Sequence, residues 1–337
     1  MPDLQDHLKD VADAVVDGKL VPFLGAGLNL CDRPPGTVFS PNQSEFLPNG
    51  AELARFFADT FRYPELSACS VRPCGFTPPP PDLSKVTQYG VTRRGPGDLY
   101  SRLTDIFGRE YPVTRAHRFL VRLCRPAPKA LKDEDRYPLI VTTNYDNLME
   151  RALEGREFDL VYYDSADDQR GQFFHKPPGG QVTPIPRERA NEYTYPFLED
   201  RPTILKMHGT VDAAADQTKG VVITEDDYID YLASEALDKL LPPRLLGKLR
   251  RNHLLFLGYG LRDWNLRVFL RRIKRAAAQN YVSWAVVKDA PEEERLNLRD
   301  TARVDVRLCD LIEYLRSLAS ELESRRVHPE GWFDGWE

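Results

Sequence analysis

Residues 20–27 read LVPFLGAG, a short apolar run that leads directly into two glycines. A run of this length without polar alternation is typical of a strand that is buried on both faces of a sheet. The glycines predict a tight turn at the carboxyl end of that strand. Residues 3–17 place their apolar side chains on one helical stripe, so we expect a helix before the strand.

Similar apolar runs recur along the chain. We predict strands at 138–142, 159–163, 202–206, 220–223, 253–257, 281–287 and 303–308. Helices are expected at 51–62, 98–108, 114–124, 146–153, 225–233, 235–250, 263–277 and 310–324. Short apolar strands that alternate with helices indicate a parallel sheet covered on both faces. The predicted fold is therefore α/β and Rossmann-like, with a mostly parallel sheet and helices on both faces.

Three stretches interrupt this alternation. Residues 29–50 are rich in Pro, Gly, Asn and Ser, and the irregular stretch 64–97 contains four consecutive prolines, which exclude a regular helix or central strand there. Residues 164–200 also break the pattern with a Pro-Pro-Gly-Gly run. We expect one domain over residues 1–324, with insertions at about 29–125 and 164–200 that form loops and a helical subdomain. An aromatic tail, 325–337, follows.

Composition excludes several classes of protein. The 337 residues are 42% hydrophobic and 29% charged, as in ordinary globular chains. A net charge of −5 argues against direct nucleic-acid binding, and no apolar run reaches the roughly 20 residues of a membrane helix. The N-terminal segment lacks the features of a secretory signal, so we expect a cytoplasmic protein. Five scattered cysteines without C-x-x-C spacing indicate free thiols and no metal site.

Glycines and polar residues follow four of the predicted strands. They are Gly25-Ala26-Gly27, Thr143-Asn144-Tyr145-Asp146, His208-Gly209 and Gly258-Tyr259-Gly260. Ligands of open α/β sheets bind outside the carboxyl ends of the strands, so we expect these segments to meet at one edge. The chain contains no G-x-x-x-x-G-K-[ST] or G-x-S-x-G sequence, which disfavours P-loop phosphoryl transfer and serine hydrolysis.

Each of these segments has both a structural and a functional interpretation. Gly25 and Gly27 either form a tight turn or let backbone N–H groups approach a diphosphate. Asn144 and Asp146 either cap the next helix or act in catalysis. His208 is the best candidate for a general base, because it lies at a strand end beside a glycine.

The other histidines and the charged helix have simpler interpretations. His117 and His253 are interpreted as structural, and the other three histidines (His7, His175 and His328) as surface residues. Basic side chains on one face between Arg267 and Arg275 indicate a solvated helix face or a contact surface for a partner. The aromatic tail either folds onto the body or anchors another chain.

Five motifs in this order resemble the sirtuin-like NAD-consuming fold, in the branch found in bacterial antiphage defence proteins. The motifs are FLGAG (23–27), TTNYD (142–146), KMHGTVD (206–212), VITEDDY (222–228) and FLGYGLRD (256–263). The resemblance implies that Gly25, Ala26 and Gly27 hold the NAD diphosphate, with Gly258 and Tyr259 on the phosphate–ribose side. It places Asn144 beside the nicotinamide ribose, Asp146 at the nicotinamide amide, His208 as the catalytic histidine, and Cys309 and Asp310 at the adenine.

The chain also departs from the sirtuin deacetylases. It lacks their four-cysteine zinc module, and residues 28–33, LNLCDR, do not follow their Gly-Ile-Pro-x-Phe-Arg pattern. Both departures favour hydrolysis of NAD by water, without a metal.

The resemblance therefore implies an NAD hydrolase that acts as the effector of an abortive-infection system. The alternatives are a deacylase or ADP-ribosyltransferase, and a non-catalytic nucleotide sensor. It also implies a homo-oligomer with a partner protein, either a hexameric ATPase translocase or a short Argonaute.

Overall fold

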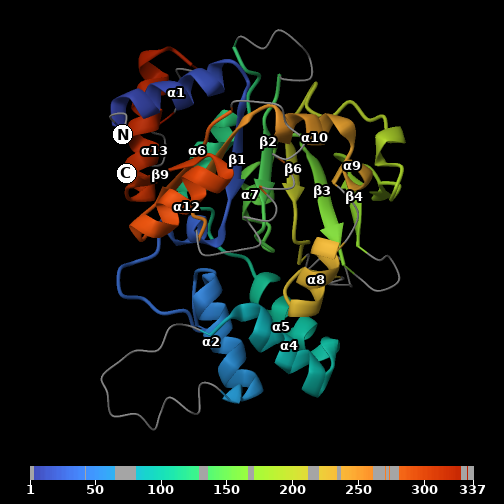
Figure 1. The fold of residues 1–337 in the computed structure, drawn as a ribbon. Helices are drawn as coiled ribbons and strands as arrows, with labels where there is room; N and C mark the ends of the chain where they lie inside the picture. The colour runs from blue at the N-terminus through green and yellow to red at the C-terminus, as the bar shows by residue number, and fades with distance from the viewer. Residues whose placement is uncertain are drawn as a thin grey trace.

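The structure is a computed structural model that describes residues 4–41, 43–64, 81–128, 136–165, 171–211, 220–233, 237–260, 270, 273, 281–327 and 332. Its strands form one nine-stranded sheet in the order β5-β4-β3-β6-β2-β1-β7-β8-β9 (Figure 1). The strands are β1 (Leu20–Leu24), β2 (Leu139–Thr142), β3 (Asp159–Asp164), β4 (Gln172–Lys176), β5 (Thr183–Pro184), β6 (Thr203–Lys206), β7 (His253–Leu257), β8 (Ser283–Val287) and β9 (Val304–Leu308).

The strands from β3 to β9 in this order run parallel, and β4 and β5 extend the sheet in antiparallel orientation. β1 lies near the centre between β2 and β7. The predicted α/β class and mostly parallel sheet are therefore confirmed. Because the parallel strands share one direction, all their carboxyl ends lie at one edge of the sheet.

The helices lie on both faces of this sheet and at its carboxyl edge. They are α1 (Leu4–Val16), α2 (Gly50–Phe61), α4 (Leu83–Arg94), α5 (Pro96–Phe107), α6 (Arg115–Leu123), α7 (Leu148–Ala152), α8 (Glu225–Ala233), α9 (Leu237–Leu240), α10 (Pro243–Arg250), α12 (Glu292–Ala302) and α13 (Leu311–Ser324). Short 3-10 helices span Ala26–Leu30 (η1) and Ala190–Glu192 (η3).

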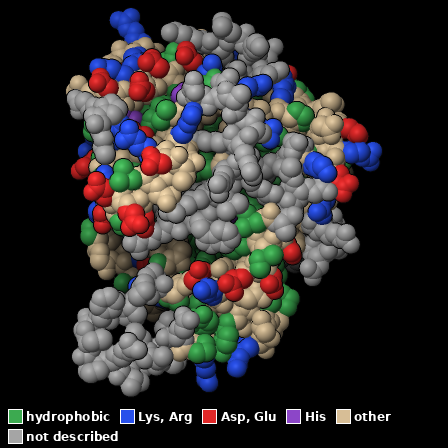
Figure 2. All heavy atoms as spheres, viewed as in Figure 1, with side chains coloured by type: hydrophobic (Ala, Val, Ile, Leu, Met, Phe, Trp, Pro, Cys, Tyr) green, Lys and Arg blue, Asp and Glu red, His purple; other side chains and the backbone are tan. Residues whose placement is uncertain are grey.

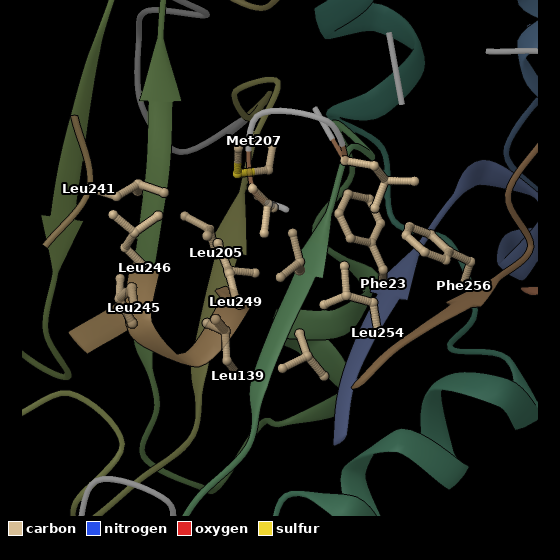
Figure 3. Close-up of a cluster of buried hydrophobic side chains, with 14 of the residues drawn as sticks. Phe23, Leu139, Leu205, Met207, Leu241, Leu245, Leu246, Leu249, Leu254 and Phe256 are labelled. Atoms are coloured by element: carbon tan, nitrogen blue, oxygen red, sulfur yellow. The ribbon is translucent and has the colours of Figure 1, made fainter. Parts of the chain in front are cut away.

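Alternate side chains of the central strands enter two separate cores, as the period of two in a strand requires. One core joins residues such as Val21 and Phe23 to α9, α10 and α12. Figure 3 shows this core, with side chains of α10 packed against those of the central strands. The other core joins Leu20, Leu24 and Ile140 to α1, α6 and α13. The complete burial of β1, β2 and β6 explains the nearly continuous apolar sequence of the central strands.

A helical subdomain made of α2, α4 and α5 lies at the carboxyl edge of the sheet, with α8 beside it (Figure 1). Asn49 and Glu52 start α2 with a reciprocal capping box, in which each side chain accepts a hydrogen bond from the backbone of the other residue. The subdomain has its own apolar core, which includes Tyr145 and Ile223 from the strand-end segments. The subdomain is therefore packed directly against the predicted site.

Several details of the secondary-structure prediction were wrong. Residues 220–223 do not form a strand; they are buried between the sheet and the subdomain, which explains their apolar sequence. The helix expected at 235–250 is divided into α9 and α10, because Pro243 begins a new helix. The helices α4 and α12 were missed since neither has a strong apolar stripe. β4 and β5 lie within the expected insertion 164–200.

Other predictions about the surface have mixed outcomes. His7 and His175, expected at the surface, are each only 1% exposed. Trp332 from the tail is buried against Phe119, and its indole N–H donates to the Val327 carbonyl. Of the helix expected at 263–277 the structure describes only Leu270 and Ile273, which are buried in the first core. The basic residues from Arg267 to Arg275, residues 261–263 of the last motif, and tail residues 328–331 and 333–337 lie outside the described residues.

On the face shown in Figure 2, acidic and basic side chains of the described residues are interspersed. Within the described part of the chain, no helix has the length and hydropathy needed to cross a membrane. The same part contains no group of three or more His, Cys, Asp or Glu side chains arranged to hold a metal ion.

Candidate functional site

The register of β2 and β6 brings Asn144 and His208 to neighbouring positions. Thr142 and Lys206 form the last residue pair between these strands. One residue further on, the Met207 N–H donates to the Thr142 carbonyl at 2.9 Å. Asn144 and His208 each lie two residues beyond the last pair, so the register sets them at equivalent positions past the carboxyl edge of the sheet.

The Thr142 side chain connects this pair of strands to the end of β1. Its hydroxyl donates to the Leu24 carbonyl at 3.2 Å and accepts the Asn144 N–H at 3.0 Å. The half-buried Asn144 side chain forms no hydrogen bond with any residue that the structure describes. Thr142 therefore fixes the backbone of Asn144, while the side-chain amide of Asn144 does not cap a helix.

Asp146 is buried and holds two parts of the site together. One carboxylate oxygen accepts the Leu148 N–H at 3.0 Å at the start of α7, and the other accepts the Asn29 amide at 2.8 Å. Asp146 thus binds the first N–H of α7 from one residue before the N-cap, Asn147, and also binds a residue of the glycine turn. The Asn29 Oδ1 atom is buried without a hydrogen-bond partner among the described residues. A ligand N–H or O–H group would satisfy that acceptor.

The imidazole of His208 lies against α8. His208 is 7% exposed, and the rings of Tyr228 and Tyr231 contact it edge-on at centroid distances of 5.5 and 5.7 Å. Its carbonyl accepts the Val222 N–H at 3.1 Å. The helix that follows the β6 segment therefore restricts the orientation of the histidine ring.

A histidine that sequence analysis placed outside the site lies close to the Asp146 carboxylate. His117 on α6 is buried, and its Nδ1 atom lies 2.8 Å from the Thr114 hydroxyl. Burial lowers the pKa of His117 to about 4, although the carboxylates of Asp146 and Asp32 oppose this shift. The imidazole is therefore neutral at neutral pH. Its sequence position on a helix gave no sign that it lies beside the site.

The glycines of the first motif, FLGAG, and the fifth motif, FLGYGLRD, pack against each other. The Gly25 N–H donates to the Leu257 carbonyl at 3.0 Å, and the Gly27 N–H donates to the Gly258 carbonyl at 2.8 Å. A Cβ atom on Gly25 would lie 2.6 Å from the Gly258 oxygen, closer than real Cβ contacts allow. The absent side chains therefore make room for a neighbouring loop. This finding adds a structural reason for the glycines, and their contact with a diphosphate stays a prediction.

Cys309 and Asp310 follow β9 at the same edge of the sheet. The Cys309 N–H donates to the Val287 carbonyl, and the Asp310 carboxylate caps α13 by accepting the Ile312 N–H at 2.9 Å. Burial raises the pKa of Cys31 to about 12, and the carboxylates of Asp32 and Asp310 add to this shift. Asp310 thus lies close enough to the end of the glycine turn to act on Cys31 electrostatically. Its contact with an adenine stays a prediction.

Sequence reasoning assigned no role to Asn29 or to Lys206. Asn29 is the one polar side chain in η1, which reads AGLNL, and this isolated position was the available signal. Lys206 was quoted in a motif, but its complete burial cannot be read from one lysine in an apolar strand. Both residues act through contacts with the segment 144–150, which is distant in sequence.

This strand-end geometry and the comparisons with known proteins define the class of the chain. The family model of the SIR2-like domain matches residues 138–306, half of the chain. The chain therefore belongs to the SIR2-like domain family. The match includes Asn144, Asp146, His208 and the Gly258–Tyr259 segment.

Two individual proteins are similar to the chain. Defense-associated sirtuin 2 of Bacillus subtilis is 23% identical over 276 residues, which cover 81% of this chain and 21% of that protein. The chain thus spans about a fifth of the length of this relative. A solved structure of a Sir2 protein with a deacetylated p53 peptide and 3'-O-acetyl ADP-ribose is 13% identical, with a TM-score of 0.36. The alignment covers 93% of this chain and 98% of that structure.

Proposed function

We propose that this chain is an NAD hydrolase that releases nicotinamide and ADP-ribose and serves as an effector of antiphage defence. The observation that carries the proposal is the β2–β6 register, which sets Asn144 and His208 at equivalent positions past the carboxyl edge of the sheet, with Thr142 bonded to the end of β1. Membership of the SIR2-like family supports NAD as the substrate. The similarity to a defence-associated sirtuin supports the biological context.

The reaction requires few chemical groups. The bond between the ribose C1′ atom and the pyridinium nitrogen breaks, and its electron pair leaves with neutral nicotinamide. A water oxygen then bonds to C1′, and the water proton passes to a base. The developing oxocarbenium character resembles that of glycoside hydrolysis. In this proposal, Asn144 positions the ribose and the water, Asp146 orients the carboxamide, and His208 accepts the proton.

The rest of the substrate would lie along the same edge of the sheet. Gly25, Ala26 and Gly27 would face the diphosphate, Gly258 and Tyr259 the phosphate–ribose side, and the Cys309–Asp310 segment the adenine. The buried Oδ1 atom of Asn29 beside Asp146 is an acceptor suited to a substrate hydroxyl or amide group. These contacts fit a dinucleotide without a metal ion.

An effector that consumes NAD needs control, because constant activity would kill its host cell. We propose a homo-oligomer regulated by a partner protein, either a hexameric ATPase translocase or a short Argonaute. The similarity to a relative of which the chain spans a fifth is compatible with regulation by parts outside this chain.

The test is release of nicotinamide from NAD by the purified protein, measured by chromatography together with ADP-ribose. The variants Asn144→Ala and His208→Ala are expected to lower the rate by about 100-fold or more, as loss of a general base or positioning group does. Asn191→Ala on η3 and His253→Ala at the start of β7 are matched controls away from the site, and we expect them to retain activity.

The products distinguish the competing functions. Nicotinamide release that requires an acylated peptide or a protein acceptor would favour a deacylase or ADP-ribosyltransferase. A wild-type protein that binds NAD without cleaving it would favour a sensor or a chain that is inactive without its partner. Absence of both binding and cleavage would overturn the proposed function.

A further inference from the structure

Lys206 at the end of β6 is fully buried, with a relative exposure of 0%. Its ammonium group donates to the Tyr145 carbonyl at 3.4 Å and, through a short hydrogen bond, to the Asp146 carbonyl. It also donates to the Glu150 carboxylate on α7 at 2.9 Å. These bonds account for the three donors of a lysine. Two of the three bonds hold the turn that follows β2.

A buried ammonium group requires a physical reason. Taking a charge out of water costs several kcal/mol, and a buried ion pair recovers this cost only when the geometry is good and the other donors are satisfied. The neighbouring β6 residues Ile204 and Leu205 are apolar and fully buried, so an apolar side chain would suit this strand. If Lys206 only neutralised Glu150, it would not need two hydrogen bonds to carbonyl groups of the turn. The hydrogen bonds of Lys206 therefore indicate that its main role is to hold the turn that follows β2.

The turn is held from three directions. Thr142 accepts the Asn144 N–H, the Val211 N–H donates to the Tyr145 carbonyl at 3.0 Å, and Lys206 binds the carbonyls of Tyr145 and Asp146. Lys206 lies two residues before His208 on the same chain segment. It thus connects the segment that carries the histidine to the turn that carries Asn144 and Asp146.

We propose that Lys206 is a positioning residue, which sets the Asn144–Asp146 turn against His208 for the reaction. This inference rests on the proposed function. Lys206 acts through the turn carbonyls and does not touch the substrate. A lysine that served only to compensate the charge of Glu150 would affect stability alone.

The experiment separates positioning from charge compensation. Lys206→Met removes the ammonium group and leaves the half-buried Glu150 carboxylate without its partner, so it is expected to destabilise the protein. The double variant Lys206→Met/Glu150→Leu removes both charges and should recover stability in urea unfolding. If Lys206 positions the turn, the double variant keeps a kcat for nicotinamide release that is about 10- to 100-fold below wild type, with KM changed far less. Lys206→Arg, which retains charge and donors, should rescue part of this loss.

Lys248 on α10 supplies a matched control. It is also buried, at 2% exposure, but its ammonium donates to the Gly18 carbonyl, where the strands begin. Lys248→Met is expected to lower stability and leave kcat unchanged. A stable double variant with wild-type kcat would overturn the inference. Equal losses of kcat in the double variant and in Lys248→Met would also overturn it.

A second readout does not depend on activity. The Leu148 amide, bonded to the Asp146 side chain, should exchange its hydrogen at least about tenfold faster in the double variant than in Lys248→Met, because the turn has lost two bonds. Unchanged exchange would overturn the positioning role. If the wild-type protein neither binds nor cleaves NAD, the proposed function fails, and the exchange data still decide whether Lys206 orders the turn.

Discussion

Substituting Gly258 by alanine tests the packing between the two glycine loops. Gly258 has a φ of +66°, and a Cβ atom there would lie 2.2 Å from the Leu28 nitrogen and 2.7 Å from the Gly27 carbonyl carbon. Those atoms belong to the backbone of the glycine turn and cannot move aside as a flexible side chain does. The loops would have to separate, and the hydrogen bond from the Gly27 N–H to the Gly258 carbonyl would be lost.

The expected magnitude of the Gly258→Ala effect has two parts. The left-handed backbone conformation costs an alanine about 1–2 kcal/mol. Leaving a buried backbone donor and acceptor unpaired costs about 1–3 kcal/mol more. We therefore expect the free energy of unfolding to fall by about 2–5 kcal/mol. NAD binding should weaken as well, since the displaced turn is the expected diphosphate site.

Urea unfolding and calorimetric titration with NAD measure these two effects. Gly179→Ala is the matched control, because Gly179 has a φ of +62° and no atom within 4 Å of an added Cβ. It carries only the backbone cost of about 1–2 kcal/mol and should bind NAD as wild type does. If Gly258→Ala is destabilised no more than Gly179→Ala, the loops are not packed as described and the reasoning is refuted.

Two further predictions follow from the buried polar groups. Asn29→Leu should lower the free energy of unfolding by about 1–3 kcal/mol, because the Asp146 carboxylate loses a buried donor. The same variant should slow nicotinamide release. Unchanged stability and rate would exclude the link between the two segments. Burial lowers the pKa values of His7 and His117 to about 4, so the unfolded chain takes up protons first as the pH falls below about 6.5. The contribution of these two histidines to stability should therefore be constant above pH 7 and decline between pH 6.5 and 4 by about 1.4 kcal/mol per pH unit for each histidine. Urea unfolding across this range should show a shallower decline in His117→Gln, and an identical slope would contradict the burial argument.

Much of the fold was predictable because the sheet is buried on both faces. The runs that became β2, β3, β6 and β7 are almost wholly apolar, and a two-sided parallel sheet requires that pattern. The segment 220–223 is equally apolar but is not a strand. A segment that is buried between two layers needs apolar residues even when its backbone does not pair with a neighbouring strand. The sequence therefore predicted which segments are buried. It did not predict whether a buried segment pairs with a strand or packs between two layers.

The two helices that were not predicted, α4 and α12, lack strong apolar periodicity. α4 buries Val86, Thr87 and Gly90, and a Cβ at Gly90 would lie 2.3 Å from the Phe61 ring. A glycine and a threonine in the buried face weaken the sequence signal of a helix. α12 buries only Leu298 and Ala302, so its sequence is mostly that of a solvated surface. Tertiary packing supplies the stability of both helices.

The sequence by itself determined the alternation of strands and helices, and it determined which residues stand at the ends of the strands. Those properties depend on local patterns of apolar residues, glycines and polar side chains. Only the tertiary structure decided that Asn29 binds Asp146, that the two glycine loops fill the space of each other's missing side chains, and that Lys206 holds the turn of Asn144. These contacts join residues far apart in the chain, and their geometry is set by the order and register of β1, β2, β6 and β7.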